Sequence, residues 1–165
     1  MSQKDKTCTI SGLRPHKLPI GTDMRIFMCA LEREIRKSIS EGYNTFLSGL
    51  AMGADIWAAQ IIIRLKKEYD DLYLICFQPC ETQADNWSAE WRRHYFKVLE
   101  LSDYVLCLQE NYSANCMHLR NIRMIDSSFR LIAVHDGISK GGTAHTINYA
   151  KNQGLEVIKI NPLEL

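Results

Sequence analysis

Short β-branched segments that alternate with longer helical segments most constrain the fold of this chain. Six apolar runs have the length and composition of strands; they occupy residues 7–11, 45–48, 73–78, 104–108, 130–135 and 156–161. A first helix is predicted to begin after Thr22 or Asp23 and to end before Gly42. Four further helices are predicted at residues 54–69, 87–101, 115–128 and 143–153. Strands and helices therefore alternate from residue 7 to residue 161.

This alternation predicts an α/β architecture with a mainly parallel sheet. Successive parallel strands need crossover connections, and right-handed crossovers through helices cover both faces of the sheet. We therefore expect a Rossmann-like, doubly wound fold. The chain of 165 residues shows no internal repeat and no Pro/Gly/Ser-rich linker, so one domain over residues 1–165 is expected.

Charge and hydropathy limit the classes of partner. Lys and Arg number 20 against 19 acidic residues, so strong nonspecific binding to nucleic acid is not expected. The first six residues are polar and lack the apolar stretch of a signal peptide, and no apolar run approaches the length of about 18 residues that a membrane span needs. We expect a cytoplasmic protein without membrane contact.

The cysteines point to the same compartment. Six cysteines are scattered through apolar segments without a CxxC pair. Free cysteine commonly behaves as a small buried hydrophobic residue, so reduced thiols are expected. Because no second Cys/His pair at zinc-finger spacing accompanies Cys76 and Cys80, no metal site is predicted.

The strongest local motif is the turn SGLAMGAD, from Ser48 to Asp55, between the second strand and its helix. Gly49 and Gly53 let backbone N–H groups approach an anion, which the start of a helix also favours. We therefore predict that this turn contacts a phosphate. The spacing matches neither a dinucleotide fingerprint nor a P-loop. The alternative is a tight turn in which Asp55 stabilises the helix N-terminus.

A second small-residue turn follows the first strand. It contains Ser11 and Gly12, and Arg14 can form a forked contact with phosphate or carboxylate. Taken alone, Arg14 also fits a surface residue in a proline-containing loop. A contact with the ligand is the functional prediction.

A third turn follows the fifth strand and ends in Gly141, Gly142 and Thr143. The glycines open a helix, and Thr143 can cap it or bond a phosphate oxygen. Turns that follow parallel strands meet at one edge of the sheet, where open α/β folds bind ligands. The three turns together predict a pocket for a phosphate-bearing, nucleotide-type ligand.

Other candidate contacts lie outside these turns. Arg120 and Asn121 are candidates for contact with phosphate, ribose or base, and the alternative is an exposed polar helix face. Asp126 follows on the same helix. Trp87 belongs to an aromatic stripe, for which core packing is the favoured interpretation and stacking on a base is the alternative.

These motifs resemble those of the SLOG superfamily, which includes DNA-processing protein A and the cytokinin-activating phosphoribohydrolases, and within it the YpsA-like proteins. The resemblance covers nearly the whole chain and rests on SGLRP at residues 11–15, LSGLAMGAD at 47–55, Gln83 with Trp87, MHLRN at 117–121, MID at 124–126, and DG and GGT within 136–143. It implies a Rossmann-like fold, a nucleotide-derived ligand at the turns and often a homo-oligomer.

The resemblance leaves the catalytic residues unassigned. The phosphoribohydrolases pair an arginine with a glutamate downstream of a PGGxGTxxE turn. Here Arg120 matches the arginine, but the segment GGTAHTIN at residues 141–148 has no matching glutamate. Asp55, Asp126 and Asp136 are the remaining candidates for a carboxylate.

A nucleotide-binding or sensing protein is therefore the leading hypothesis. The first alternative is a phosphoribohydrolase-like hydrolase of a nucleoside monophosphate or an ADP-ribose-like substrate, with Arg120 holding the phosphate. A protein-interaction module is the second alternative. A Rossmann oxidoreductase is disfavoured because no glycine fingerprint follows the first strand. No cofactor is predicted apart from a nucleotide-derived ligand.

Overall fold

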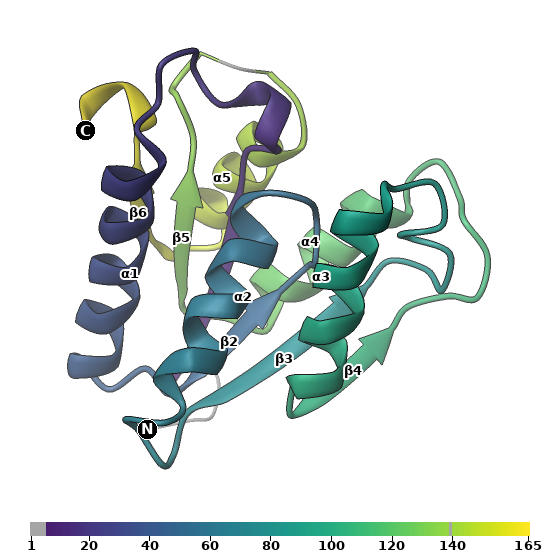
Figure 1. Ribbon diagram of the computed structural model, residues 1–165, viewed down its shortest axis with the longest axis horizontal. Helices are drawn as coiled ribbons and strands as arrows, with labels where there is room; N and C mark the ends of the chain where they lie inside the picture. Colours follow the sequence, from purple (N-terminus) through teal and green to yellow (C-terminus); the bar gives the residue numbers. More distant parts are fainter. Residues whose placement is uncertain (1–5, 139) are drawn as a thin grey trace.

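The computed structural model describes residues 6–138 and 140–165, and its centre is one six-stranded sheet. The strands are β1 (Thr7–Gly12), β2 (Thr45–Ser48), β3 (Tyr73–Gln78), β4 (Tyr104–Cys107), β5 (Arg130–Val134) and β6 (Glu156–Ile160). All five neighbouring pairs are parallel, and the strand order is β4-β3-β2-β1-β5-β6 (Figure 1). The predicted Rossmann-like, doubly wound α/β fold is confirmed.

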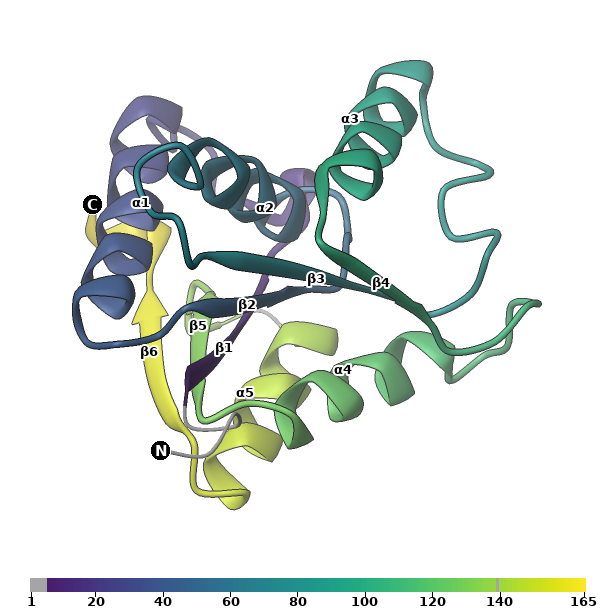
Figure 2. The same ribbon diagram turned by 90° about the horizontal axis from the view of Figure 1, so that it is seen from below.

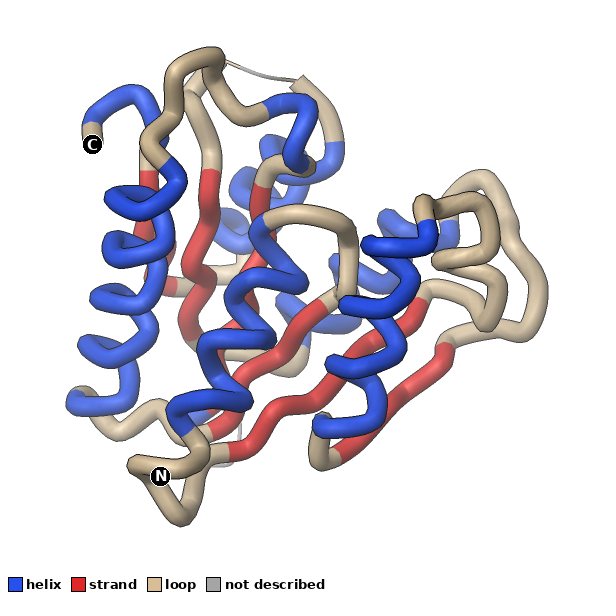
Figure 3. The backbone as a smooth tube through the Cα atoms, viewed as in Figure 1, coloured by secondary structure: helices blue, strands red, loops and turns tan. Residues whose placement is uncertain are grey.

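Five helices cover both faces of this sheet. They are α1 (Met24–Ser40), α2 (Ala54–Leu65), α3 (Ala89–Leu101), α4 (Cys116–Asp126) and α5 (Gly142–Asn152). Helices α1, α2 and α3 lie on one face, and α4 and α5 lie on the other (Figure 2). Figure 3 shows the helices alternating with the strands, as the sequence predicts. Within the described residues, no helix is both long and apolar enough to cross a membrane.

Local capping sets the helix ends, several of which differ from the predicted bounds. Asp23 accepts hydrogen bonds from the backbone N–H groups of Arg25 and Ile26, so it is the N-cap of α1. Ser88 accepts from the N–H of Trp91, and α3 therefore begins at Ala89, two residues later than predicted. A 3₁₀ helix, η2 (Pro15–Lys17), forms after β1, and a second, η3 (Pro162–Glu164), lies near the C-terminus.

The sheet packs between two apolar layers. The larger joins it to α1, α2 and α3, and its fully buried side chains include Phe27, Phe46 and Ile62. On the opposite face, Met124 of α4 packs against Leu47 and Phe77, while α5 contributes to a separate cluster. Burial of apolar area in both layers stabilises the fold and fixes the ends of the strands relative to the helices.

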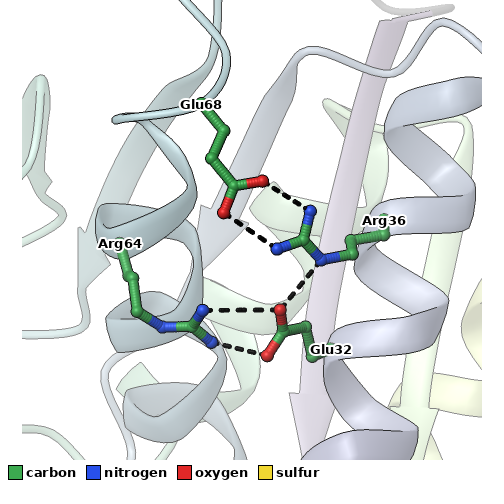
Figure 4. A network of polar contacts seen from close by, with 4 residues as sticks. All are labelled: Glu32, Arg36, Arg64 and Glu68. Carbon is green, nitrogen blue, oxygen red and sulfur yellow. Dashed lines mark hydrogen bonds and ion pairs between the residues drawn. The ribbon is translucent and has the colours of Figure 1, made fainter.

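A surface ion-pair network joins α1 to α2 (Figure 4). Arg36 donates to Glu32 at 2.8 Å and to both carboxylate oxygens of Glu68 at 2.7 and 2.9 Å. Arg64 also donates to Glu32, and these bonds from Arg64 and Arg36 lower the pKa of the Glu32 carboxyl. Solvent screens such pairs, so the network mainly orients two helices that the core already holds together.

Four of the six cysteines are buried, and all six are free thiols. Burial raises the pKa of Cys8 and of Cys76 to about 12. A thiol is a weak nucleophile until it ionises, so these two are unreactive packing residues. Cys29 and Cys107 are exposed.

Candidate functional site

A cavity of about 340 Å³ lies at the carboxyl ends of the central strands. The chain proceeds from β1 towards β2 in one direction and from β5 towards β6 in the other, so the strand order reverses between β1 and β5. Open α/β sheets bind ligands at such a reversal. The wall consists of Ser11, Gly12, Leu13, Arg14, His16, Lys17, Ala51, Asp55, Met117, Arg120, Asn121, His135, Lys140, Gly142, Thr143 and Ala144.

Positive charge dominates this wall. Arg14, Lys17, Arg120 and Lys140 contribute four cationic side chains, whereas Asp55 contributes a single carboxylate. Low-dielectric walls that carry one sign of charge focus the electrostatic field inside a cleft. The cavity therefore favours an anionic ligand.

The N-terminus of α5 opens onto the same cavity. Gly142, Thr143 and Ala144 line it, and the N-cap residue Gly141 makes no side-chain capping bond. The first backbone N–H groups of a helix have no partner within that helix and carry part of its positive dipole. Lys17 lies beside this end, with Nζ 3.4 Å from the point where a Cβ on Gly141 would stand. Backbone N–H groups and the Lys17 ammonium group are therefore two kinds of donor for phosphate oxygens at this end of the cavity.

Arg120 is the most deeply buried cation of the wall, at 4% exposure. Its guanidinium donates to the carbonyl oxygen of Gly49 through Nη1, and to Asn121 Oδ1 through Nε at 2.7 Å. Gln83 donates to the same carbonyl at 3.0 Å. A Cβ on Gly49 would lie 2.5 Å from the guanidinium, so only glycine lets Arg120 take this position. Burial lowers the pKa of Arg120, and the negative charge of Asp55 opposes that shift.

Asp55 lies in the first turn of α2 and is 4% exposed. Burial raises its pKa to about 6, although the charge of Arg120 and backbone hydrogen bonds from Ala51 and Gly12 act in the opposite direction. Ser48 donates to the backbone carbonyl of Asp55 at 3.1 Å, which fixes the turn before α2. The cavity therefore contains one carboxyl group that changes charge close to neutral pH.

The structure brings eight of the predicted site residues to the cavity wall. They are Ser11, Gly12, Arg14, Asp55, Arg120, Asn121, Gly142 and Thr143. They come from the end of β1 and the residues after it, from the first turns of α2 and α5, and from α4, so residues up to 132 positions apart in the chain share one wall. Their contact with a ligand stays a prediction.

Six other predicted site residues do not line the cavity: Ser48, Gly49, Gly53, Trp87, Asp126 and Gly141. Gly53 has a φ of +95°, and a Cβ there would lie 2.7 Å from the carbonyl oxygen of Leu13. Glycine is needed at this position because the turn after β1 packs directly against the start of α2. Gly49 and Gly53 thus have packing roles, and their predicted phosphate contacts remain predictions.

Trp87 and Asp126 have partners within the protein. The Trp87 ring packs edge-to-face on Tyr95 with centroids 5.3 Å apart and lies against the main core. The hydroxyl of Tyr149 donates to Asp126 at 2.8 Å. The contacts of Trp87 agree with the core-packing interpretation, and neither side chain reaches the cavity wall.

The residue-level prediction missed Lys17, Lys140, His16 and His135. His16 and Lys17 belong to η2, in the connection after β1, and Lys140 belongs to the turn before α5. The sequence feature that points to them is their position after a parallel strand. His135 directly follows β5, and its Nδ1 accepts a hydrogen bond from the N–H of Gly137 at 3.0 Å. This bond leaves Nε2 as the protonated nitrogen of a neutral ring.

Metal chemistry has no ready ligand set in this region. Across residues 6–138 and 140–165, no three His, Cys, Asp or Glu side chains form a group that could hold a metal ion. The cavity wall instead offers N–H donors and cationic side chains, which suit phosphate oxygens.

The fold and the cavity define a Rossmann-like protein with a cationic pocket at the reversal point of its sheet. Residues 8–163 match the model of the family described as the YspA SLOG family, and the chain belongs to this family. It is similar to the UPF0398 protein of Bacillus cereus strain B4264, with 26% identity over 155 residues, which covers 90% of this chain and 84% of the relative. A UPF0398 protein of Bacillus thuringiensis strain Al Hakam matches to the same extent.

Replacing Asp55 with Asn is expected to stabilise the protein at neutral pH. The folded-state pKa of Asp55, about 6, exceeds the ordinary value of 3.8. With respect to this group the folded state is most stable below about pH 4, where the carboxyl is protonated, and it loses that stability as the pH rises to about 6. The loss amounts to about 2–3 kcal/mol. Urea unfolding at pH 4 and pH 7 should therefore show Asp55→Asn gaining stability only at pH 7.

The exposed residue Asp70 provides the control for this experiment. Asp70→Asn should leave the difference in unfolding free energy between the two pH values unchanged. An Asp55→Asn variant that is less stable than wild type at pH 7, or whose gain is the same at pH 4, would contradict the burial argument.

Replacing Gly49 with Ala is expected to destabilise the fold, because the new methyl group would overlap the Arg120 guanidinium. We expect a loss of about 1–3 kcal/mol in the free energy of unfolding. Gly142→Ala is the matched control, since nothing lies within 4 Å of the added Cβ. In the first turn of α5 this change should be neutral or slightly stabilising. Equal losses in the two variants would refute the packing role of Gly49.

Proposed function

We propose that this protein binds a phosphate-bearing nucleotide derivative in the cavity between β1 and β5 and acts as a binding or sensing module. The observation that carries the proposal is the composition of the wall, where four Lys/Arg side chains and the start of α5 face the same space as one carboxyl group. Anions bind at helix N-termini when backbone N–H groups and nearby cations point towards them.

Size and chemistry support a ligand larger than free phosphate. A volume of about 340 Å³ lies at the lower end of the range for small-molecule sites. We place the phosphate between Lys17, Lys140 and the first turn of α5. Asn121 and His135 offer polar groups for a ribose or a base, and Met117 offers apolar surface. The nucleotide character of the ligand is the expectation that accompanies the SLOG family.

Thermal denaturation against a panel of nucleotides tests this proposal. AMP, ADP-ribose, NAD and cyclic nucleotides are each added at millimolar concentration, and inorganic phosphate is the reference ligand. Specific binding to the folded state raises the melting temperature, so at least one nucleotide should stabilise the protein more than phosphate alone. A panel without any stabilising member would refute nucleotide binding and favour the protein-interaction alternative.

Lys17→Ala should weaken binding of the most stabilising nucleotide by about 10- to 100-fold, because it removes a charge-assisted contact beside the start of α5. Lys17 is exposed, so the melting temperature without ligand should stay close to that of wild type. Lys67→Ala, an exposed change on another part of the surface, is the control and should leave the affinity unchanged. Isothermal titration calorimetry gives both dissociation constants. Equal affinity of Lys17→Ala and wild type would exclude the proposed phosphate position.

A second candidate function is hydrolysis of the N-glycosidic bond of a nucleoside monophosphate. The observation that favours it is the location of Asp55, since it is the one carboxylate among the described residues of the wall, whereas Asp126 and Asp136 lie outside it. In this proposal Arg120 orients the substrate and ionised Asp55 stabilises the developing oxocarbenium ion. Water then adds to the anomeric carbon as the base leaves with a proton.

Chromatography of AMP incubated with the protein tests this second candidate. The expected products are adenine and ribose 5-phosphate. Asp55→Asn should lower the rate by at least about 100-fold because the variant cannot carry the negative charge. Asp126→Asn, outside the wall, should retain the activity. No release of adenine would eliminate the hydrolytic role and leave the binding proposal standing, whereas release that persists in Asp55→Asn would eliminate the role assigned to Asp55.

A further inference from the structure

The edge strand β4 is apolar and exposed along its whole length. Tyr104, Val105 and Leu106 are 63%, 44% and 51% exposed, and Cys107 is exposed as well. Figure 1 shows β4 at the border of the sheet, and within the described parts of the chain no strand pairs with its outer edge. Unpaired backbone groups beside apolar side chains form a template for another strand.

The opposite border of the sheet is protected in a way that β4 is not. Edge strand β6 carries the charged residues Glu156 and Lys159, which discourage pairing with another chain. Strand β4, with the sequence YVLC, contains no charge and no proline. The two edges therefore differ in charge, which is a property that controls intermolecular strand pairing.

We propose that β4 pairs antiparallel with β4 of a second copy of this chain, which joins the two sheets into one. Leu108 donates its N–H to the carbonyl of Gln78 in β3 at 3.0 Å. Successive residues of a strand direct their backbone N–H and C=O groups to opposite edges. The backbone groups of Leu106 therefore also point to β3, whereas those of Val105 and Cys107 point outward. The outward residues supply the hydrogen bonds of the dimer.

This pattern selects one register. Val105 lies opposite Cys107 of the second copy, and Leu106 lies on the two-fold axis. A register with Val105 on the axis would place Cys107 opposite Asp103, whose N–H already donates to Leu74 of β3 at 2.9 Å. The selected register uses the outward groups of both Val105 and Cys107, and it buries Leu106 against its symmetry mate.

Charges on α3 favour a second copy of this chain as the occupant. Figures 1 and 2 both place α3 beside β4 at this border. A groove on α3 is lined by Arg93, Phe96, Lys97 and Glu100, together with His94. The two-fold axis makes α3 antiparallel to its copy, so Arg93, near the start of the helix, lies towards the end of the second α3, where Glu100 stands and pairs with Lys97 of its own chain at 3.1 Å. Opposite charges then meet around the exposed Phe96 ring.

Light scattering after size-exclusion chromatography tests the proposal with the full chain at about 50 µM. Wild type should have twice the 19.0 kDa mass of one chain. Leu106→Lys places two like charges at the axis and should weaken dimerisation by at least about 100-fold. Val105→Pro removes an outward N–H that the monomer does not use, so it should also abolish the dimer while the circular dichroism spectrum stays unchanged.

Ile20→Lys is the matched control, because Ile20 is a fully exposed apolar residue on the loop after β1. It should remain a dimer. A wild-type protein of single-chain mass would overturn the proposal. So would a dimer that survives both β4 substitutions, or one that dissociates on Ile20→Lys as readily as on the β4 substitutions.

Discussion

The contact between Arg120 and the carbonyl of Gly49 links the two sides of the sheet. Helix α4 covers one face and α2 the other, and this hydrogen bond spans the carboxyl edge between them. It requires a residue without a side chain at position 49 and places a buried guanidinium at the cavity wall. The geometry of the turn before α2, and with it the position of Asp55, depends on this contact.

The electrostatics of the site follow from that arrangement. Asp55 partly compensates the buried charge of Arg120, but burial still raises its pKa to about 6. Arg14, Lys17 and Lys140 have no equal number of carboxylates in the wall, so an excess of positive charge faces the cavity. A bound phosphate would neutralise part of that excess, which gives a physical reason for the pocket to prefer an anionic ligand.

Within the described residues the sequence predicted the order and type of every strand and α-helix, because each segment carries its own hydrophobic period, but it did not predict the 3₁₀ helices η2 and η3. It also predicted which turns meet, since parallel strands bring them to one edge. It did not distinguish a glycine that contacts a ligand from one that makes room for a neighbour. Gly49 accommodates Arg120, which is 71 positions away, and Gly53 accommodates the turn after β1. Such close approaches depend on tertiary packing.

The place of Lys17 and Lys140 in the cavity wall was also not predicted from the sequence. In the sequence they resemble ordinary surface lysines. Lys140 stands two residues before α5, and the fold brings Lys17, from the connection after β1, to the same helix start. Nor does the apolar pattern of residues 104–107 distinguish a buried strand from an exposed edge. That difference arises from the strand order, which leaves β4 with one neighbour.

The most direct test of the cavity as a nucleotide site is a titration with ADP-ribose followed by the backbone amide signals of the ¹⁵N-labelled protein. The account predicts saturable shifts at Gly142, Thr143 and Ala144 and in the loop that contains Lys17, with small changes at β6 and η3. Absence of shifts at the start of α5, or shifts confined to the groove between residues 19–26 and 162–165, would contradict it.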